Sequence, residues 1–146
     1  MVTIKKWVEA EKEAFFIRYQ VFVVEQKVPI ELELDGLDDL GLHVLIYQDG
    51  KAVGTARLVF ENSTEAIHAV GRIGRVSILQ AYRGQGYARK LIQALIDSND
   101  AQELREFYLH AQTSSVHLYK KMGFELEGDV FEEAGIKHQL MRFNRG

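Results

Sequence analysis

An amphipathic stretch that begins at Ala88 restricts the possible folds of this chain more than any other feature of its sequence. Its apolar residues recur at i, i+3, i+4, i+7 and i+8 and define one helix face: Ala88, Leu91, Ile92, Leu95 and Ile96. Extended segments are predicted on both sides of this helix, at Ile73 to Leu79 and at Glu106 to Ala111. A strand, helix, strand unit with a right-handed crossover follows, and the helix must bury its apolar face on a sheet. The sequence therefore predicts an α/β fold.

A two-residue turn, Asp49-Gly50, predicts a β-hairpin between His43 to Tyr47 and Ala52 to Phe60. The other predicted elements are a strand near Thr3 to Val8, a helix over residues 10–24 that is closed by Val28-Pro29, a short helix capped by Ser114 or Ser115, and strands at Phe124 to Glu127 and Ile136 to Phe143. Together these elements predict a mixed sheet flanked by helices.

An extended stretch from Ala66 to Leu79 contains two glycines, Gly71 and Gly74. Glycine inside a strand marks a bulge or the close approach of another backbone or a ligand. We therefore expect an irregularity in this strand.

Composition excludes several function classes. The 146 residues fit a single domain over 1–146, and the formal charge of -3 leaves no basic surplus for nucleic acid. The absence of Cys excludes disulfides and cysteine-based catalysis. No apolar run suits a signal peptide or a bilayer span, so we expect a cytoplasmic protein that contacts no membrane; a homodimer is allowed.

The histidines give no indication of a metal site, because none of them shows the His-x-x-x-His spacing of a helical zinc pair. A satisfied or solvent-exposed side chain is the default interpretation for four of them: His43, His68, His110 and His117. An acidic stretch runs from Glu31 to Asp39, and its default interpretation is a solvated loop.

The segment between the predicted strand and helix, from Tyr82 to Ala88, has the chemistry of a phosphate cradle. Gly84 and Gly86 let the backbone approach a ligand, and the N–H groups at a helix start favour an anion. Arg83 adds positive charge. A third small residue for a dinucleotide fingerprint is missing at Arg89, and neither a Walker loop nor a serine elbow occurs.

Two motifs in the right order resemble the GCN5-related N-acetyltransferase (GNAT) superfamily. Arg83-x-x-Gly86-x-Ala88 resembles its pyrophosphate-binding motif, and the segment from Leu118 to Phe124, with Tyr119 on a helix before Gly-Phe, resembles its second motif. The segments 18–26, 33–35 and 131–138 resemble the ElaA-like branch.

This resemblance implies a mostly antiparallel central sheet with a splayed strand pair, formed here by Ile73 to Leu79 and Glu106 to Ala111. It implies that acetyl-CoA is the co-substrate and that its acetyl group passes by direct attack to a primary amine of a small molecule or peptide. The backbone of residues 84 to 88 would hold the pyrophosphate, open backbone would pair with the pantetheine, and Tyr119 would protonate the thiolate. The implied cofactor-binding residues are Val76, Ile78, Arg83, Gly84, Gln85, Gly86, Tyr87, Ala88 and Gln112.

The general base is left unassigned, because residues 66–79 contain no Asp or Glu where many members of the superfamily carry one. Glu33, Asp35 and His138 are candidates for it and for contact with the acceptor, since they match the branch, but each could equally bond its neighbours. The alternative function is a regulatory module that binds acyl-CoA without catalysis. Such a module would need neither Tyr119 nor an amine pocket.

Overall fold

One seven-stranded sheet organises the protein. The computed structural model describes residues 1–62 and 69–146. The strand order is β1-β2-β3-β4-β5-β7-β6, in which β4 and β5 are parallel and all other neighbours are antiparallel. The strands are β1 (Val2–Lys6), β2 (Gly41–Gln48), β3 (Lys51–Asn62), β4 (Ala69–Ile78), β5 (Glu106–Gln112), β6 (Glu125–Glu133) and β7 (Ile136–Asn144). The predicted mixed, mostly antiparallel sheet is confirmed.

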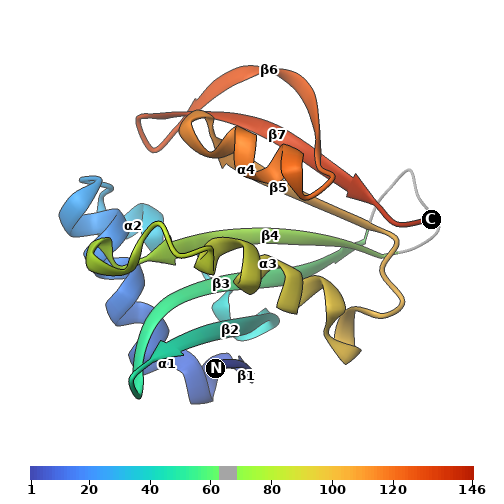
Figure 1. The fold of residues 1–146 in the computed structure, drawn as a ribbon. Helices are drawn as coiled ribbons and strands as arrows, with labels where there is room; N and C mark the ends of the chain where they lie inside the picture. Colours follow the sequence, from blue (N-terminus) through green and yellow to red (C-terminus); the bar gives the residue numbers. More distant parts are fainter. Residues whose placement is uncertain (63–68) are drawn as a thin grey trace.

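Helices cover both faces of the sheet (Figure 1). The face that carries α3 and α4 is called the front face below, and the face that carries α1 is called the back face. The helices are α1 (Trp7–Arg18), a π-helix η1 (Tyr19–Glu25), α2 (Ile30–Glu33), α3 (Tyr87–Asp97) and α4 (Val116–Lys121), with short 3₁₀ turns η2 (Asp38–Leu40), η3 (Gln80–Tyr82), η4 (Asn99–Ala101) and η5 (Thr113–Ser115).

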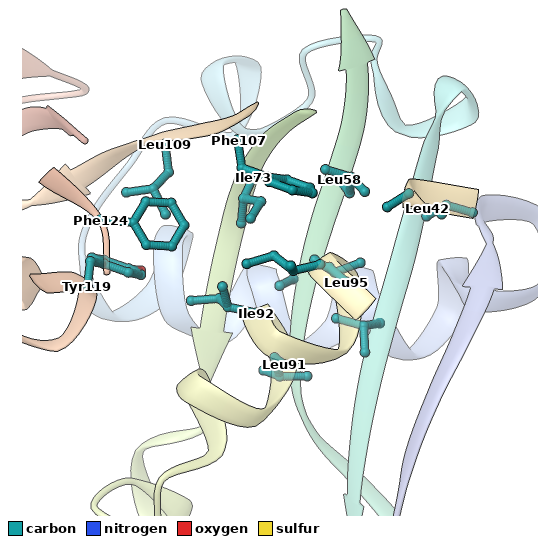
Figure 2. Close-up of a cluster of buried hydrophobic side chains, with 14 of the residues drawn as sticks. Leu42, Leu58, Ile73, Leu91, Ile92, Leu95, Phe107, Leu109, Tyr119 and Phe124 are labelled. Carbon is teal, nitrogen blue, oxygen red and sulfur yellow. The ribbon is translucent and has the colours of Figure 1, made fainter. Parts of the chain in front are cut away.

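The helix predicted from Ala88 is α3, and it supplies the centre of the front-face core (Figure 2). Leu91, Ile92 and Leu95 are fully buried against side chains of β3, β4 and β5. Burying an aliphatic side chain of this size contributes roughly 1.5–3 kcal/mol relative to leaving it exposed. This packing holds the start of α3 at the end of β4.

The predicted hairpin is confirmed as β2 and β3, with Gln48 paired to Lys51 across the turn. Asp49 and Gly50 both have positive φ, at 52° and 78°, which is the geometry of a type I′ turn. This turn matches the natural twist of the two strands and sets their register.

Several predicted boundaries differ from the structure. The first strand ends at Lys6 rather than Val8, because Trp7 already begins α1. The helix predicted over residues 10–24 is instead α1 followed by the π-helix η1. The strand predicted to end at Glu127 continues as β6 to Glu133, across a register shift between Glu127 and Phe131. That extension brings the side chain of Glu133 within reach of His110 on β5, across the intervening strand β7.

A bulge interrupts β4, which is one of the two alternatives that its glycines indicated. Between the pairs Thr55–Ser77 and Arg57–Gly74, β4 contains one residue more than β3. Arg75 lies in this bulge with a φ of 55°, a left-handed conformation that is unfavourable for a residue with a side chain. Of the predicted stretch from Ala66 to Leu79, residues 66–68 lie outside the described residues.

Candidate active site

The candidate site lies where the two parallel strands separate. β4 and β5 pair from Val70–Glu106 to Ile73–Leu109, and their described pairing ends there, directly before the bulge (Figure 1). A pocket of about 660 Å³ fills the region beyond. It is lined by both strands, the η1 helix, the start of α3, and α4.

This pocket passes from one face of the sheet to the other. Side chains of β5 alternate, so that Leu109 and Ala111 enter the front-face core while His110 and Gln112 point to the back face. The pocket is lined by Gly86 and Tyr119 from the front face and by His110 from the back face. Two ligands can therefore meet in the gap between the strands, one from each face.

Backbone groups of β4 face this gap. The N–H of Leu79 donates to the carbonyl of Val53 at 2.9 Å, so alternate residues of β4 turn toward β3 at this end. Val76 and Ile78 consequently turn their backbone groups toward the gap. The carbonyl of Ile78 already accepts a hydrogen bond from Nε of Arg83 at 2.9 Å. The backbone groups left for the predicted pairing with an extended ligand are those of Val76 and the N–H of Ile78.

The predicted phosphate cradle forms the connection into α3. Gly84 and Gly86 have φ values of 80° and 78°, and α3 begins at Tyr87, directly after Gly86. A Cβ atom added to either glycine would meet no atom within 4 Å, so the backbone conformation, rather than crowding, requires glycine here. Gln85 lies between the two glycines, and Ala88 lies in the first turn of α3. Tyr87 and Ala88 line the pocket, and the N–H groups of a first helical turn have no partner within their own helix, so they can bind an anion there.

Arg83 is ion-paired in this structure. Its two terminal nitrogens lie 2.6 Å from the two carboxylate oxygens of Glu25, at the end of η1. Hydrogen bonding to Arg83 lowers the pKa of Glu25, and the same contact raises the pKa of Arg83. A phosphate at the cradle would compete with Glu25 for this guanidinium.

Tyr119 belongs both to the core and to the pocket. Its ring packs edge-on against Phe124 with the ring centres 5.9 Å apart, and only 6% of the residue is exposed (Figure 2). The side chain also lines the pocket. Burial raises the pKa of Tyr119 to about 12, so its hydroxyl stays protonated at neutral pH and remains a donor.

Gln112 is held by a second amide at the gap. Its Nε2 donates to Oε1 of Gln26 at 3.0 Å, and Nε2 of Gln26 returns a longer bond of 3.4 Å. Gln26 follows η1, so this pair ties the back-face helix to the end of β5. Both residues line the pocket.

The expectation of a solvated loop holds only for part of the acidic stretch: Glu31 and Asp39 are exposed, but for Glu33 and Asp38 the expectation is wrong. Glu33 is 2% exposed and Asp38 is 7% exposed, because both pair with Arg18, itself 1% exposed. The nitrogens of Arg18 lie 2.8 Å from an oxygen of each carboxylate. Unpaired charges could not be buried this deeply, so the contacts with Arg18 are what allow the burial.

Two further arginines extend this cluster to the pocket wall. Arg57 contacts Asp35 at 2.8 Å and Asp38 at 3.1 Å, and Arg75 contacts Glu33 at 2.7 Å and Asp35 at 3.2 Å. We call the six residues the ion cluster: Arg18, Glu33, Asp35, Asp38, Arg57 and Arg75. Arg57 and Arg75 line the pocket, and the carboxylates lie behind them.

The electrostatics of Asp35 follow from this position. Burial alone would raise its pKa, but hydrogen bonds from Arg57 and from the N–H of Leu37, with the charges of Arg57 and Arg75, lower it to about 2. The carboxylate of Glu33 has no exposed area. A direct contact of Glu33 or Asp35 with an acceptor stays a prediction, and in this structure both carboxylates bind arginines.

His138, the third residue predicted from the branch, lines the pocket on the back face. Its Nδ1 lies 2.7 Å from the carbonyl of Ile136, and its ring stacks on Phe131. Beside it lie two residues that were not predicted for the site, His110 and Glu133, whose Nδ1 and Oε2 atoms are 3.1 Å apart. The alternation of β5 could have placed His110 at the gap, but no sequence signal places Glu133 beside it.

The other histidines of the sequence lie away from this cluster or outside the described residues. His43 is buried under Trp7, and its Nε2 lies 2.9 Å from the carbonyl of Asp38; burial lowers its pKa. His117 is exposed at the pocket edge, and His68 lies outside the described residues. Within residues 1–62 and 69–146 no group of His, Asp and Glu could hold a metal ion, and no helix there could span a membrane.

Comparisons with known proteins agree with this geometry. A family model described as an acetyltransferase (GNAT) domain matches residues 10–145. The uncharacterized N-acetyltransferase YjcF of Bacillus subtilis is 35% identical over 136 residues, which cover 92% of this chain and 93% of that protein.

Solved structures share the whole fold. An acyl-CoA N-acyltransferase from Pseudomonas aeruginosa is similar with a TM-score of 0.83 and 31% identity over 98% of each chain. ElaA of Escherichia coli is similar with a TM-score of 0.79 and 26% identity, covering 99% of this chain and 100% of that chain. The separated parallel strands, the glycine cradle and the full-length matches together show that this chain belongs to the GNAT family of acyl-CoA N-acyltransferases, as its ElaA-like motifs predicted.

Proposed function

We propose that this protein is an acetyl-CoA-dependent N-acetyltransferase that acetylates a primary amine of a small molecule or peptide by direct attack. Membership of the family supports acyl transfer from an acyl-CoA co-substrate. The absence of Cys in the sequence agrees with a ternary complex, because no cysteine can carry the acyl group between two half-reactions.

The observation that carries this proposal is a pocket that crosses the sheet and has different chemistry at its two ends. The front end has the cradle and the open backbone of Val76, which fit a pyrophosphate and an amide-containing arm that adds like a strand. The back end is lined by polar side chains, including Gln112 and His138. A module that only binds acyl-CoA has no need of this second opening.

Tyr119 would act as the general acid. Attack by the amine expels a thiolate, and a buried tyrosine whose pKa is raised to about 12 keeps its proton until that charge develops. An N–H beside the bulge of β4 would stabilise the oxyanion of the tetrahedral intermediate.

A thiol-release assay with acetyl-CoA and a panel of amines tests the proposal. The panel should contain polyamines, amino acids, aminoglycosides and peptide N-termini. We expect amine-dependent release of free CoA, with a matching acetylated product in the mass spectrum. Binding of CoA without turnover for any amine would favour the regulatory module.

A further inference from the structure

The proposed function leaves the general base unassigned, and the back-face end of the pocket contains a cluster that fits this role. Glu133, near the end of β6, and His110, on β5, are 23 positions apart in sequence, yet Oε2 of Glu133 lies 3.1 Å from Nδ1 of His110. Both residues line the pocket. The extension of β6 beyond its bulge is what brings them together.

This contact determines which ring nitrogen of the neutral imidazole carries the proton. A carboxylate accepts, so the proton of the neutral ring lies on Nδ1 and Nε2 keeps a free lone pair. Packing also restricts the orientation of the ring, because Phe131 lies edge-on against it with the ring centres 5.1 Å apart. A histidine oriented by a carboxylate, with its other nitrogen available, is the arrangement that general bases use.

The location of His110 at the gap between β4 and β5 also suits a general base. The described pairing between β4 and β5 ends at Leu109, so His110 is the first residue of β5 at the gap. Its side chain points to the back face, whereas Tyr119 belongs to the front-face core. A base on one face and an acid on the other match a reaction in which the amine and the thiol lie on opposite sides of the sheet.

We propose that His110, oriented by Glu133, is the general base that removes a proton from the ammonium group of the acceptor. This assignment rests on the proposed function. His138 lies on the other side of Glu133: its Nδ1 is 2.7 Å from the Ile136 carbonyl, and its Nε2 is 4.0 Å from Oε1 of Glu133.

The proposed reaction conserves its protons. Nε2 of His110 takes one proton from the ammonium, and the neutral nitrogen then forms a C–N bond with the thioester carbon. Collapse of the intermediate breaks the C–S bond, and Tyr119 gives its proton to the sulfur. The second proton on nitrogen leaves through water and reprotonates Tyr119, while His110 releases its proton to solvent. The net products are an amide, free CoA and one proton.

Several titratable or charged groups lie around His110. Glu133 on β6, His138 on β7 and Tyr108 on β5 lie nearest, with ring centres of Tyr108 and His110 6.1 Å apart. Three arginines line the same pocket from the neighbouring strands: Arg57, Arg72 and Arg75. Glu133 is the one of these groups that directly stabilises the imidazolium.

The test compares the pH dependence of kcat/KM in three variants, with Glu132→Gln as the matched control. Glu132 neighbours Glu133 on β6 but does not line the pocket. We expect His110→Ala to lose roughly 10²- to 10⁴-fold in kcat/KM at neutral pH and to lose the acid limb of the profile. Added imidazole should restore part of the turnover. Glu133→Gln should lose less and should move the acid limb to lower pH, and Glu132→Gln should do neither.

The outcomes separate this assignment from the proposed function. If the wild-type protein turns over an amine and His110→Ala keeps the acid limb, with only a raised acceptor KM or a lower Tm, the pair merely ties β6 to β5 and the assignment is overturned. The absence of wild-type turnover with every amine overturns the proposed function, and the base assignment falls with it. CoA affinity, measured by calorimetry, should stay within twofold in all variants.

Discussion

The two ends of the pocket are built in opposite ways. On the front face the cradle lies within seven consecutive residues, and Tyr119 lies five residues before Phe124, against which it packs. On the back face the wall combines the ion cluster with Glu133 and His110, and these side chains come from α1, α2, β3, β4, β5 and β6 and from the chain between α2 and β2. The front-face end is therefore built from residues that are close in sequence, and the back-face end from side chains that are far apart in sequence.

Under the proposed function, this difference follows from what each end would bind. A pyrophosphate can be held by backbone N–H groups, which every residue except proline supplies, so a turn with two glycines is sufficient. An acceptor must be distinguished from other amines, and such selectivity needs particular side chains in particular places. Arg57 and Arg75 can be held at the pocket wall because Asp35, Asp38 and Glu33 neutralise them from behind.

The largest expected effect concerns the front end. Gly86→Val should abolish CoA binding, because a branched residue resists a φ of 78° and its side chain would occupy the phosphate position. Calorimetry with CoA measures this loss. The matched control is Gly128→Val, since Gly128 has the same φ of 78° and equally open space but lies in β6. Both variants should lose roughly 1–2 kcal/mol of stability, and only the first should lose CoA. Equal CoA affinity in the two variants would refute the cradle.

The next effect separates chemistry from packing at Tyr119. Tyr119→Phe keeps the ring and its contact with Phe124, so we expect a folded protein with near-normal CoA affinity. Its kcat should fall roughly 10²- to 10⁴-fold, the usual contribution of general acid catalysis. Unchanged turnover with a good acceptor would leave the thiolate to depart unaided or through water.

The same variant should also differ from the wild type in its stability at alkaline pH. Because the pKa of Tyr119 is raised from 10 to about 12 by burial, the wild-type protein should lose about 3 kcal/mol of stability as the pH rises from 10 through 12. Tyr119→Phe should lack this part of the loss. The contribution of Tyr108, whose pKa is also raised to about 12, should persist. Urea unfolding at several alkaline pH values measures the difference.

The smallest effect concerns the ion cluster. Asp35→Asn should lower stability at neutral pH by about 1–2 kcal/mol, because it removes a partly solvent-screened carboxylate from Arg57 and Arg75. The folded pKa of about 2 lies below the ordinary value of 3.8, so this stability is present above pH 3.8 and disappears as the pH falls through 2. Wild type and variant should therefore converge in acid.

Exposed Asp39 supplies the control for that series. Asp39→Asn leaves the ion cluster intact and should track the wild type in urea unfolding at every pH. If Asp35→Asn tracked the wild type as well, the contacts of Asp35 with Arg57 and Arg75 would contribute nothing measurable, as is common for solvent-screened ion pairs.

The sequence by itself determined the β2–β3 hairpin, the helix α3 and the cradle before it. The apolar spacing of α3, the Asp49-Gly50 turn and the glycines at 84 and 86 act over a few residues, and such local signals leave few alternative structures. The glycines of β4 indicated either a bulge or a close approach, but they did not decide between the two or show which residue would occupy the left-handed position.

Only the tertiary structure decided the back of the site. Nothing in the acidic stretch shows that Arg18, Arg57 and Arg75 will neutralise it, because these arginines come from three different elements. The meeting of Glu133 with His110 likewise depends on the register of β6 on β7 and of β7 on β5. Ion pairs and hydrogen bonds between side chains carry no periodicity along the chain, so the fold must form before their partners are known.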